Sequence, residues 1–218
     1  MKKAIFLFSI AALTAVFVSA QAVDDYKKGE FYVGYSNGQV DTGLDSGSTA
    51  ADFFRDRQTF HGFEASGVYN LNRYFGVKGD ISGTYNGSRF TGNFDVGGSP
   101  ATVSFDTDSS LYNFLGGVQI KDNSRSGRFK PFAHALVDAG HARTKFSDFT
   151  CAPGNLCTAI FVPDESTSGT GFAGAFGGGL DIRLNDKFQI RAFQVDYNPV
   201  RIEGNTQHNV RFGAGIVF

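Results

Sequence analysis

Acidic and basic residues recur inside short apolar stretches of this 218-residue chain. They alternate with apolar neighbours, so each stretch would have one polar and one apolar face if it were an extended strand. Charges of both signs gathered on such faces would pair, because a lone charge in a low-dielectric interior is costly. The residues that we expect to form such a network are Glu64, Lys78, Asp80, His134, Asp138, Asp181, Arg183, Arg191 and Arg211.

The histidines give no sign of a catalytic or metal-binding site. His61, His134, His141 and His208 are scattered along the chain, and none shows an H-E-x-x-H or similar spacing. His134 shares a strand face with Asp138, which we interpret as a hydrogen-bonded pair rather than as a catalytic one. We therefore predict a protein that is not an enzyme, with no catalytic residue, no bound metal and no cofactor.

Cys151 and Cys157 are the two cysteines of the chain, and they bracket the segment Ala-Pro-Gly-Asn-Leu. An exported protein meets an oxidising compartment, in which two close cysteines form a disulfide. A metal site would need further ligands nearby, and the sequence offers none. We predict a disulfide that contributes roughly 2 kcal/mol and mostly orders a loop.

The N-terminal sequence is typical of an export signal. A pair of lysines precedes an apolar run from Ala4 to Val18, which is too short to span a bilayer comfortably. An A-x-A cleavage signal ends at Ala22, although cleavage after Ala20 is an alternative. We predict a signal peptide at residues 1–22 and one domain at residues 23–218. An N-terminal membrane anchor would need a longer apolar run and no cleavage signal.

Composition limits the class of protein. The chain has 20 basic and 21 acidic residues, and removing the two lysines of the leader leaves 18 against 21, a net charge of −3. This balance argues against nucleic-acid binding, which needs a surplus of basic residues. After the leader, no apolar run approaches the roughly 18 residues of a membrane helix. The 28 glycines, 24 phenylalanines and 8 tyrosines, with only 5 prolines, suit a β-barrel.

Period-two alternation of apolar and polar residues predicts eight strands. They are Glu30–Ser36, Phe60–Leu71, Tyr74–Tyr85, Leu111–Lys121, Phe129–His141, Gly171–Leu184, Phe188–Tyr197 and Asn209–Phe218. The seventh strand fits less well, because Arg191 and Asp196 fall on opposite faces under strict alternation. A β-bulge near Ala192-Phe193 would bring Arg191, Gln194 and Asp196 to one side, although the sequence does not require it.

Long and short connections alternate between these strands. Residues 37–58, a polar segment after Tyr85 and residues 142–170 are long, whereas 72–73, 122–127 and 185–187 are short. Outer-membrane barrels have short turns in the periplasm and long loops outside. The sequence therefore predicts an all-β fold, an eight-stranded antiparallel up-and-down transmembrane β-barrel, with both termini in the periplasm.

The C-terminal segment is the most membrane-like part of the chain. Val210, Phe212, Ile216 and Phe218 share one apolar face, and the opposite face is small or polar and includes Arg211. The last strand of a membrane barrel faces lipid on alternate residues and closes against the first strand. This segment therefore predicts a lipid-facing final strand.

Three segments resemble a known family. They are Phe63–Asp80, Ala175–Leu184 with the following Phe188–Arg191, and the terminal Arg211–Phe218. They are similar to the small eight-stranded outer-membrane barrels typified by the outer membrane protein A transmembrane domain and outer membrane protein X. The resemblance implies a monomer with a plugged lumen that the β-barrel assembly machinery inserts into the bacterial outer membrane. It also implies that the last strand is the assembly signal, through Val210, Phe212, Ile216 and Phe218.

The expected role is structural or interactive and is carried by the long extracellular loops. Expected partners are outer-membrane lipid and lipopolysaccharide, and a host or surface partner at the loops. A lipid A-modifying enzyme is one alternative, and it would need a nucleophile, a base and an acid near the lipid-facing wall. A narrow channel is another. A secreted lipocalin-like barrel would place its apolar face inside, which the mixed charges of the polar face oppose.

Overall fold

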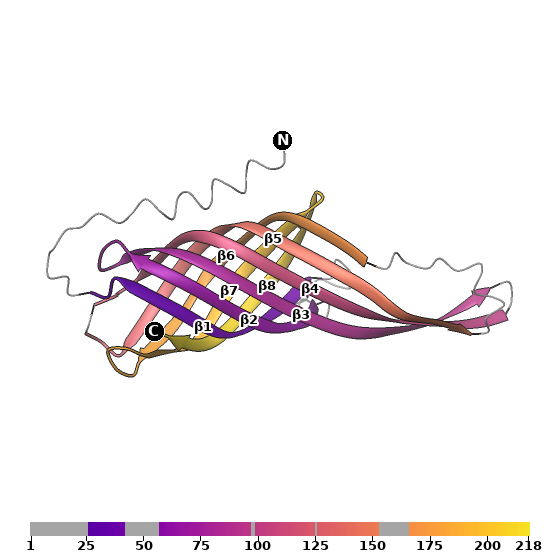
Figure 1. The fold of residues 1–218 in the computed structure, drawn as a ribbon, viewed down its shortest axis with the longest axis horizontal. Helices are drawn as coiled ribbons and strands as arrows, with labels where there is room; N and C mark the ends of the chain where they lie inside the picture. The colour runs from indigo at the N-terminus through magenta and orange to yellow at the C-terminus, as the bar shows by residue number, and fades with distance from the viewer. Residues whose placement is uncertain (1–25, 42–56, 97–98, 125, 153–165) are drawn as a thin grey trace, which may run out of the picture.

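The computed structural model describes residues 26–41, 57–96, 99–124, 126–152 and 166–218. Eight strands pair antiparallel in sequence order, and the last pairs with the first, so the sheet closes into a barrel (Figure 1). The predicted all-β, eight-stranded fold is confirmed. The strands are β1 (Gly29–Asp41), β2 (Arg57–Asn70), β3 (Phe75–Val96), β4 (Ser99–Lys121), β5 (Phe129–Ala152), β6 (Ser166–Arg183), β7 (Gln189–Ile202) and β8 (Asn205–Val217). In the described part of the chain, no helix is long and apolar enough to cross a membrane.

The outer wall of the barrel is apolar. In β1, the side chains of Phe31, Val33 and Tyr35 are 51%, 44% and 50% exposed, whereas Glu30 and Tyr32 are buried. The pattern recurs around the barrel because successive side chains of a strand point to opposite faces. A lipocalin-like barrel would place the apolar side chains inside, so that alternative does not describe this fold. An apolar outer wall suits contact with lipid.

The barrel closes where β8 meets β1. The backbone N–H of Phe218 donates to the carbonyl of Phe31 at 2.8 Å, and the N–H of Phe31 donates to the carbonyl of Phe218 at 3.2 Å. The Phe218 ring packs against Phe31 and Phe188, with centroid separations of 6.5 and 5.5 Å. Ile216 faces outward and Arg211 is buried, as the alternation of the tail predicts.

β3 and β4 continue beyond the barrel as a long hairpin, which β5 joins to form a three-stranded sheet (right-hand side of Figure 1). The β3–β4 register is unbroken as far as the pair Val96 and Ser99. The prediction of a long polar loop after Tyr85 is therefore wrong. The predicted loop at 142–170 is also too long, because β5 ends only at Ala152.

The alternation of apolar and polar residues did not predict this hairpin, because its residues are mostly polar. Apolar–polar alternation reports a strand with one buried face, and this segment is rich in Ser, Thr, Asn and Asp on both faces. Cross-strand pairs support it instead. The hydroxyls of Ser88 and Thr107 are 2.8 Å apart, and the rings of Phe90 and Phe105 stack with centroids 5.0 Å apart.

β7 contains the predicted β-bulge. Its pairing with β8 shifts between Arg191 and Gln194, and both Ala192 and Phe193 are exposed. Two successive outward residues reset the alternation, so that Arg191, Gln194 and Asp196 all point inward. They are 2%, 1% and 0% exposed. The bulge therefore orients three polar side chains into the interior of the barrel.

Two of the short turns are built in the same way. In the β2–β3 turn, the side-chain oxygen of Asn72 accepts the backbone N–H groups of Tyr74 and Phe75 at 2.8 and 2.9 Å. In the β6–β7 turn, Asn185 accepts the equivalent two N–H groups, both at 2.9 Å. An asparagine that caps its own turn explains why these connections are tight.

Candidate functional site: the charged network inside the barrel

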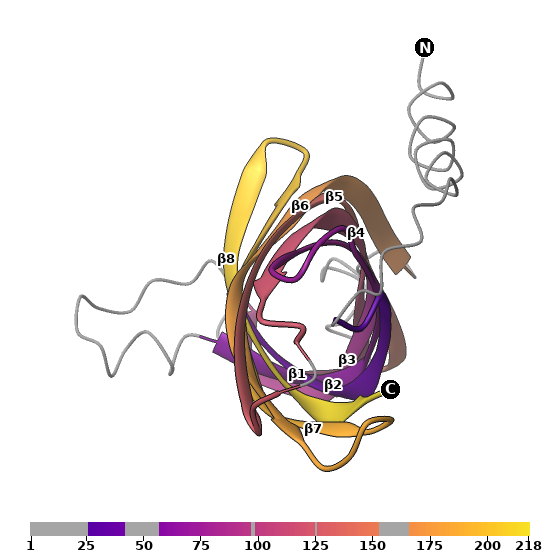
Figure 2. The ribbon, with the colours of Figure 1, turned by 90° about the vertical axis from the view of Figure 1, so that its left-hand side faces the viewer.

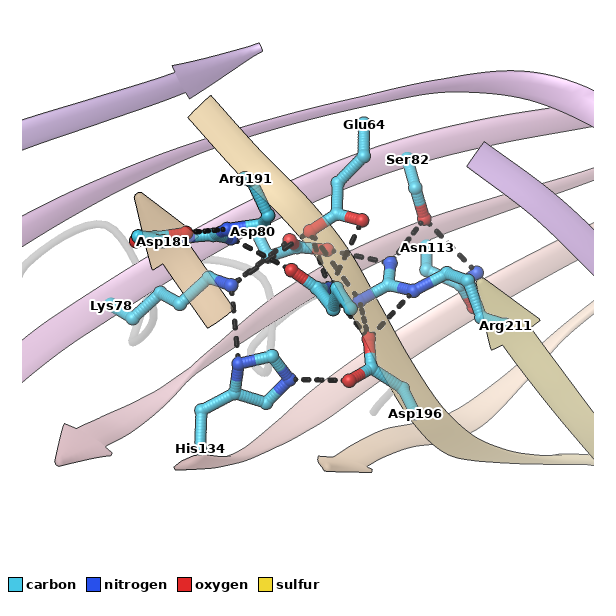
Figure 3. A network of polar contacts seen from close by, with 11 residues as sticks. Glu64, Lys78, Asp80, Ser82, Asn113, His134, Asp181, Arg191, Asp196 and Arg211 are labelled. Carbon is cyan, nitrogen blue, oxygen red and sulfur yellow. Dashed lines mark hydrogen bonds and ion pairs between the residues drawn. The ribbon is translucent and has the colours of Figure 1, made fainter. Parts of the chain in front are cut away.

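Arg211 of β8 is the centre of the interior network (Figure 3). Its guanidinium donates to Asp196 at 2.7 and 3.0 Å, to Asp80 at 2.9 Å and to the Ser82 hydroxyl at 3.0 Å. It also lies 3.7 Å from the carboxylate of Glu64. An arginine suits this position because its donors fan out in one plane. One cation thus holds acids from β2, β3 and β7.

Lys78 and His134 complete this group. The Lys78 ammonium lies 3.8 Å from both Glu64 and Asp80, and 3.3 Å from Nδ1 of His134. Nε2 of His134 is 2.9 Å from Asp196. The imidazole thus lies with Nδ1 toward the Lys78 ammonium and Nε2 toward the Asp196 carboxylate. His134 therefore bridges a cation and an anion.

Arg191, which the β7 bulge orients into the interior, is the centre of a second group of interacting side chains. Its guanidinium donates twice to Asp181, at 2.8 and 3.2 Å, and once to the side-chain oxygen of Gln194, at 2.7 Å. The rings of Tyr32 and Phe132 lie 4.2 and 4.1 Å from its central carbon, which adds cation–π attraction. The amide of Gln194 donates to carboxylates of the Arg211 group. The two groups are therefore one network.

Lys121 extends the network toward the short turns. Its ammonium donates to both carboxylate oxygens of Glu30 at 2.9 Å, to Asp181 at 2.8 Å and to Gln189 at 3.1 Å. The Gln189 amide donates in turn to Glu30 at 3.1 Å. Asp181 is thus shared between Lys121 and Arg191.

On the other side of Arg211 the interior becomes apolar. Asn113 donates to Ser82 at 3.3 Å, and beyond it begins a cluster of side chains that are at most 5% exposed. Its members are Leu111, Leu115, Leu136, Ala173, Ala175 and Val200. An eight-stranded barrel has an interior that side chains alone can fill.

Most of the predicted network residues meet in this interior. Those that do are Glu64, Lys78, Asp80, His134, Asp181, Arg191 and Arg211. The prediction is wrong for Asp138, which is exposed and has the apolar residues Leu115 and Ala173 as register partners, so no charged group lies beside it among the described residues of the neighbouring strands. It is also wrong for Arg183, whose side chain is 28% exposed at the rim and lies 4.0 Å from Asp186.

Five buried members of the network were not among the predicted network residues. They are Glu30, Lys121, Gln189, Gln194 and Asp196. Each is the sequence neighbour of an exposed apolar residue, so the alternation that we used elsewhere could have placed it inside. The partner of His134 is Asp196, from a different strand, and not Asp138 as predicted.

The described residues contain no group of three or more His, Cys, Asp or Glu placed to hold a metal ion. The outward histidines His61, His141 and His208 are hydrogen-bonded to the hydroxyls of Tyr35, Thr170 and Tyr197 respectively. In a nucleophile–base–acid arrangement, a carboxylate orients the imidazole. In these three pairs a hydroxyl is hydrogen-bonded to the imidazole instead.

Other predicted residues lie at the ends of the described segments. Phe212, Ile216 and Phe218 of the predicted assembly signal are exposed on the outer wall, and Val210 is half-buried on the same face. The predicted signal peptide and Cys157 lie outside the described residues. The disulfide therefore stays a prediction.

A closed eight-stranded barrel with a charged interior and an apolar outer wall defines a transmembrane β-barrel of the outer-membrane type. The family model of the outer membrane protein beta-barrel domain matches residues 8–218, and the chain belongs to this family. The protein is therefore an integral protein of the bacterial outer membrane. A search of curated proteins found no match.

Solved structures of small outer-membrane barrels share this fold. Ail, the attachment invasion locus protein of Yersinia pestis, in complex with the heparin analogue sucrose octasulfate, is 23% identical with a TM-score of 0.51, over 88% of this chain and 100% of that one. A second Ail structure is 20% identical with a TM-score of 0.50, over 88% and 99%. Neisserial surface protein A is 10% identical with a TM-score of 0.49, over 87% and 95%. The two Ail similarities bear on the fold alone.

Proposed function

We propose that this protein is a non-enzymatic outer-membrane barrel with a closed interior, and that its external sheet makes contacts at the cell surface. The observation that carries the surface role is the continuation of β3, β4 and β5 beyond the barrel (Figure 1). A paired sheet holds its side chains in fixed positions, so less conformational entropy is lost on binding than from a flexible loop. The expected partner is a protein on a neighbouring or host cell.

Charge pairing supports the closed interior. Within the described interior, the acids Glu30, Glu64, Asp80, Asp181 and Asp196 are paired with Lys78, Lys121, Arg191 and Arg211. An ion could pass only by displacing these pairs. Leaving one member of a buried pair without its partner costs several kcal/mol.

Planar-bilayer recording tests the closed interior. We expect no steady conductance from the folded protein, apart from rare openings. A steady, ion-selective conductance would contradict the closed interior and support the narrow-channel alternative.

An aromatic patch on the external sheet supports a protein partner. The ring of Phe105 stacks on Phe90 and Phe149, at 5.0 and 6.3 Å between centroids, and meets the edge of Phe146 at 5.9 Å. Phe90 is 46% exposed. Rigid aromatic side chains are enriched at the centres of protein interfaces.

A sulfated ligand is the rival for this surface, because Ail was crystallised with a heparin analogue. The described part of the external sheet carries basic and acidic residues in similar numbers. The basic residues are Arg89, Arg143 and Lys145, and the acidic ones are Asp95, Asp106, Asp108 and Asp148. Such a balance does not favour a polyanion over a protein.

Adhesion assays with matched variants test the surface role. Bacteria producing the protein are compared for autoaggregation and for adhesion to cultured cells and to heparin-coated plates. Replacing Phe90 and Phe105 by serine should abolish adhesion and leave the gel mobility of the folded barrel unchanged. The control replaces the neighbouring pair Ser88 and Thr107 by alanine and should adhere normally. Equal adhesion by cells with and without the protein would contradict the proposed role.

A further inference from the structure

A polar pocket lies at the end of the barrel that carries the short turns, next to Lys121 of the network. We expect this end to face the periplasm. Figure 2 looks into this end, where the β4–β5 connection crosses the opening. The pocket has a volume of about 180 Å³, which is room for several water molecules or a small ligand. Its walls come from the segment before β1, the β4–β5 connection, the β6–β7 turn and the adjoining ends of β1, β5, β6 and β7.

Asn123 in the wall of the pocket has a side chain without a partner. It is 3% exposed, and in the described part of the structure neither its side-chain oxygen nor its nitrogen makes a hydrogen bond. Its backbone is fixed, because its N–H donates to the carbonyl of Arg73 and its carbonyl accepts from the N–H of Lys27. A buried amide is costly when unpaired, so it indicates that a further group binds there.

Two cations with unused donors face the same pocket. Among the described residues, the ammonium of Lys27 makes no hydrogen bond, and the nearest acid to the Arg183 guanidinium is Asp186 at 4.0 Å. Burial lowers the pKa of Lys27 from its usual value, the nearby Lys121 lowers it further, and Glu30 opposes both. A bound anion would therefore relieve the cost of keeping this lysine charged.

The other charged groups at the pocket are already engaged. The ammonium of Lys130 donates to three backbone carbonyls, at 2.6 to 3.1 Å, so it contributes positive charge but no further donor. Glu30 is held by Lys121 at 2.9 Å. The carboxylate of Asp122 is held by Arg73 at 2.9 and 3.1 Å, and these bonds keep its pKa below the usual range. Asp186 is 89% exposed and lies largely in solvent.

We propose that this pocket is a binding site for a small periplasmic anion with a carboxylate or phosphate group. Lys27 and Arg183 supply the charge-assisted hydrogen bonds, and the Asn123 amide supplies a neutral donor. A peptide C-terminus and inorganic phosphate both have this chemistry. The site is independent of the surface role, because it lies at the opposite end of the barrel.

Titration calorimetry of the folded full-length mature chain in detergent micelles tests the site. The probes are inorganic phosphate, acetyl-Ala-Ala with a free carboxylate, and acetyl-Ala-Ala-amide, which lacks the negative charge. We expect saturable binding of at least one of the first two probes, weaker binding at high salt, and no binding of the amide. Tighter binding of phosphate would indicate that the site takes inorganic phosphate, and tighter binding of acetyl-Ala-Ala would indicate that it takes a peptide C-terminus.

Three variants assign the contacts. Lys27→Gln and Arg183→Gln should each weaken binding at least tenfold, as expected for the loss of one charge-assisted hydrogen bond. The matched control Lys187→Gln removes a cation from the same rim, outside the pocket wall, and should bind as the native chain does. All three variants should retain the gel mobility of the folded barrel.

Two results would overturn the proposal. One is the absence of saturable binding by either anion. The other is equal weakening of binding by the control variant Lys187→Gln.

Discussion

Replacing Arg211 by methionine is the most direct test of the interior network. The change keeps a long side chain but removes the two hydrogen bonds to Asp196, one to Asp80 and one to Ser82. Lys78, at 3.8 Å from Asp80, is then the cation nearest to that carboxylate. The variant thus leaves acids in the interior with too little positive charge.

The expected loss of stability follows from the buried carboxylates of Asp196 and Asp80, which lose their arginine partner. Removing one partner of a buried ion pair costs roughly 3–5 kcal/mol. Arg211 serves two acids directly, so we expect a loss near the upper end, about 5 kcal/mol. The separate hydrogen bonds cannot simply be summed, because contacts in one network are not additive. Adding Asp196→Asn removes one of the orphaned charges and should recover about 1.5–3 kcal/mol.

Urea unfolding in phospholipid vesicles measures these differences. The chain has no tryptophan, so the folded fraction is best read from the gel mobility of unheated samples. Arg183→Met is the control, because this half-buried arginine at the rim has only a 4.0 Å contact with the exposed Asp186 and should change stability by less than about 1 kcal/mol. Equal stability of Arg211→Met and this control, or no recovery of stability on adding Asp196→Asn, would contradict the role given to Arg211.

Three further predictions concern assembly, oxidation and topology. Deleting Phe218 should lower the level of assembled barrel in outer-membrane fractions, because this residue closes the β1–β8 seam; normal levels would count against an assembly role. Thiol labelling of unreduced protein from the envelope should find neither Cys151 nor Cys157 reactive, and two reactive thiols would rule out the disulfide. Protease added to intact cells should cut within residues 42–56 and spare 185–187, whereas cleavage of the short turn alone would invert the topology.

The interior of the barrel was largely predictable from local pattern. Glu64 follows the outward Phe63 and Asp80 precedes the outward Ile81 in regular alternation, and both acids are buried. The bulge at Ala192-Phe193 could be inferred because strict alternation would have put Arg191 and Asp196 on opposite walls. Asp138 shows where the pattern fails. Its place in the alternation is correct, but the strands on either side present Leu115 and Ala173 at that level.

The external hairpin shows a second limit of the sequence. Residues after Tyr85 pair with β4 as far as Val96 and Ser99, although their composition is that of a loop. Outside the membrane, neither face of a strand has to be apolar, so the hydrophobic signal disappears while the backbone pairing continues. Cross-strand contacts such as Phe90 with Phe105 stabilise this pairing, and they depend on a register that only the folded sheet defines.

The sequence by itself determined which side chains face lipid and which face the interior, because alternation is a local property of an extended strand. It also determined that the interior would hold charges of both signs. Only the tertiary structure decided which acid meets which base. Arg211 reaches Asp80 across 131 residues of chain, and this contact depends on the closure of β8 against β1 and on the register of every strand between them. Closure is a property of the whole sheet, so no local pattern can specify such a pair.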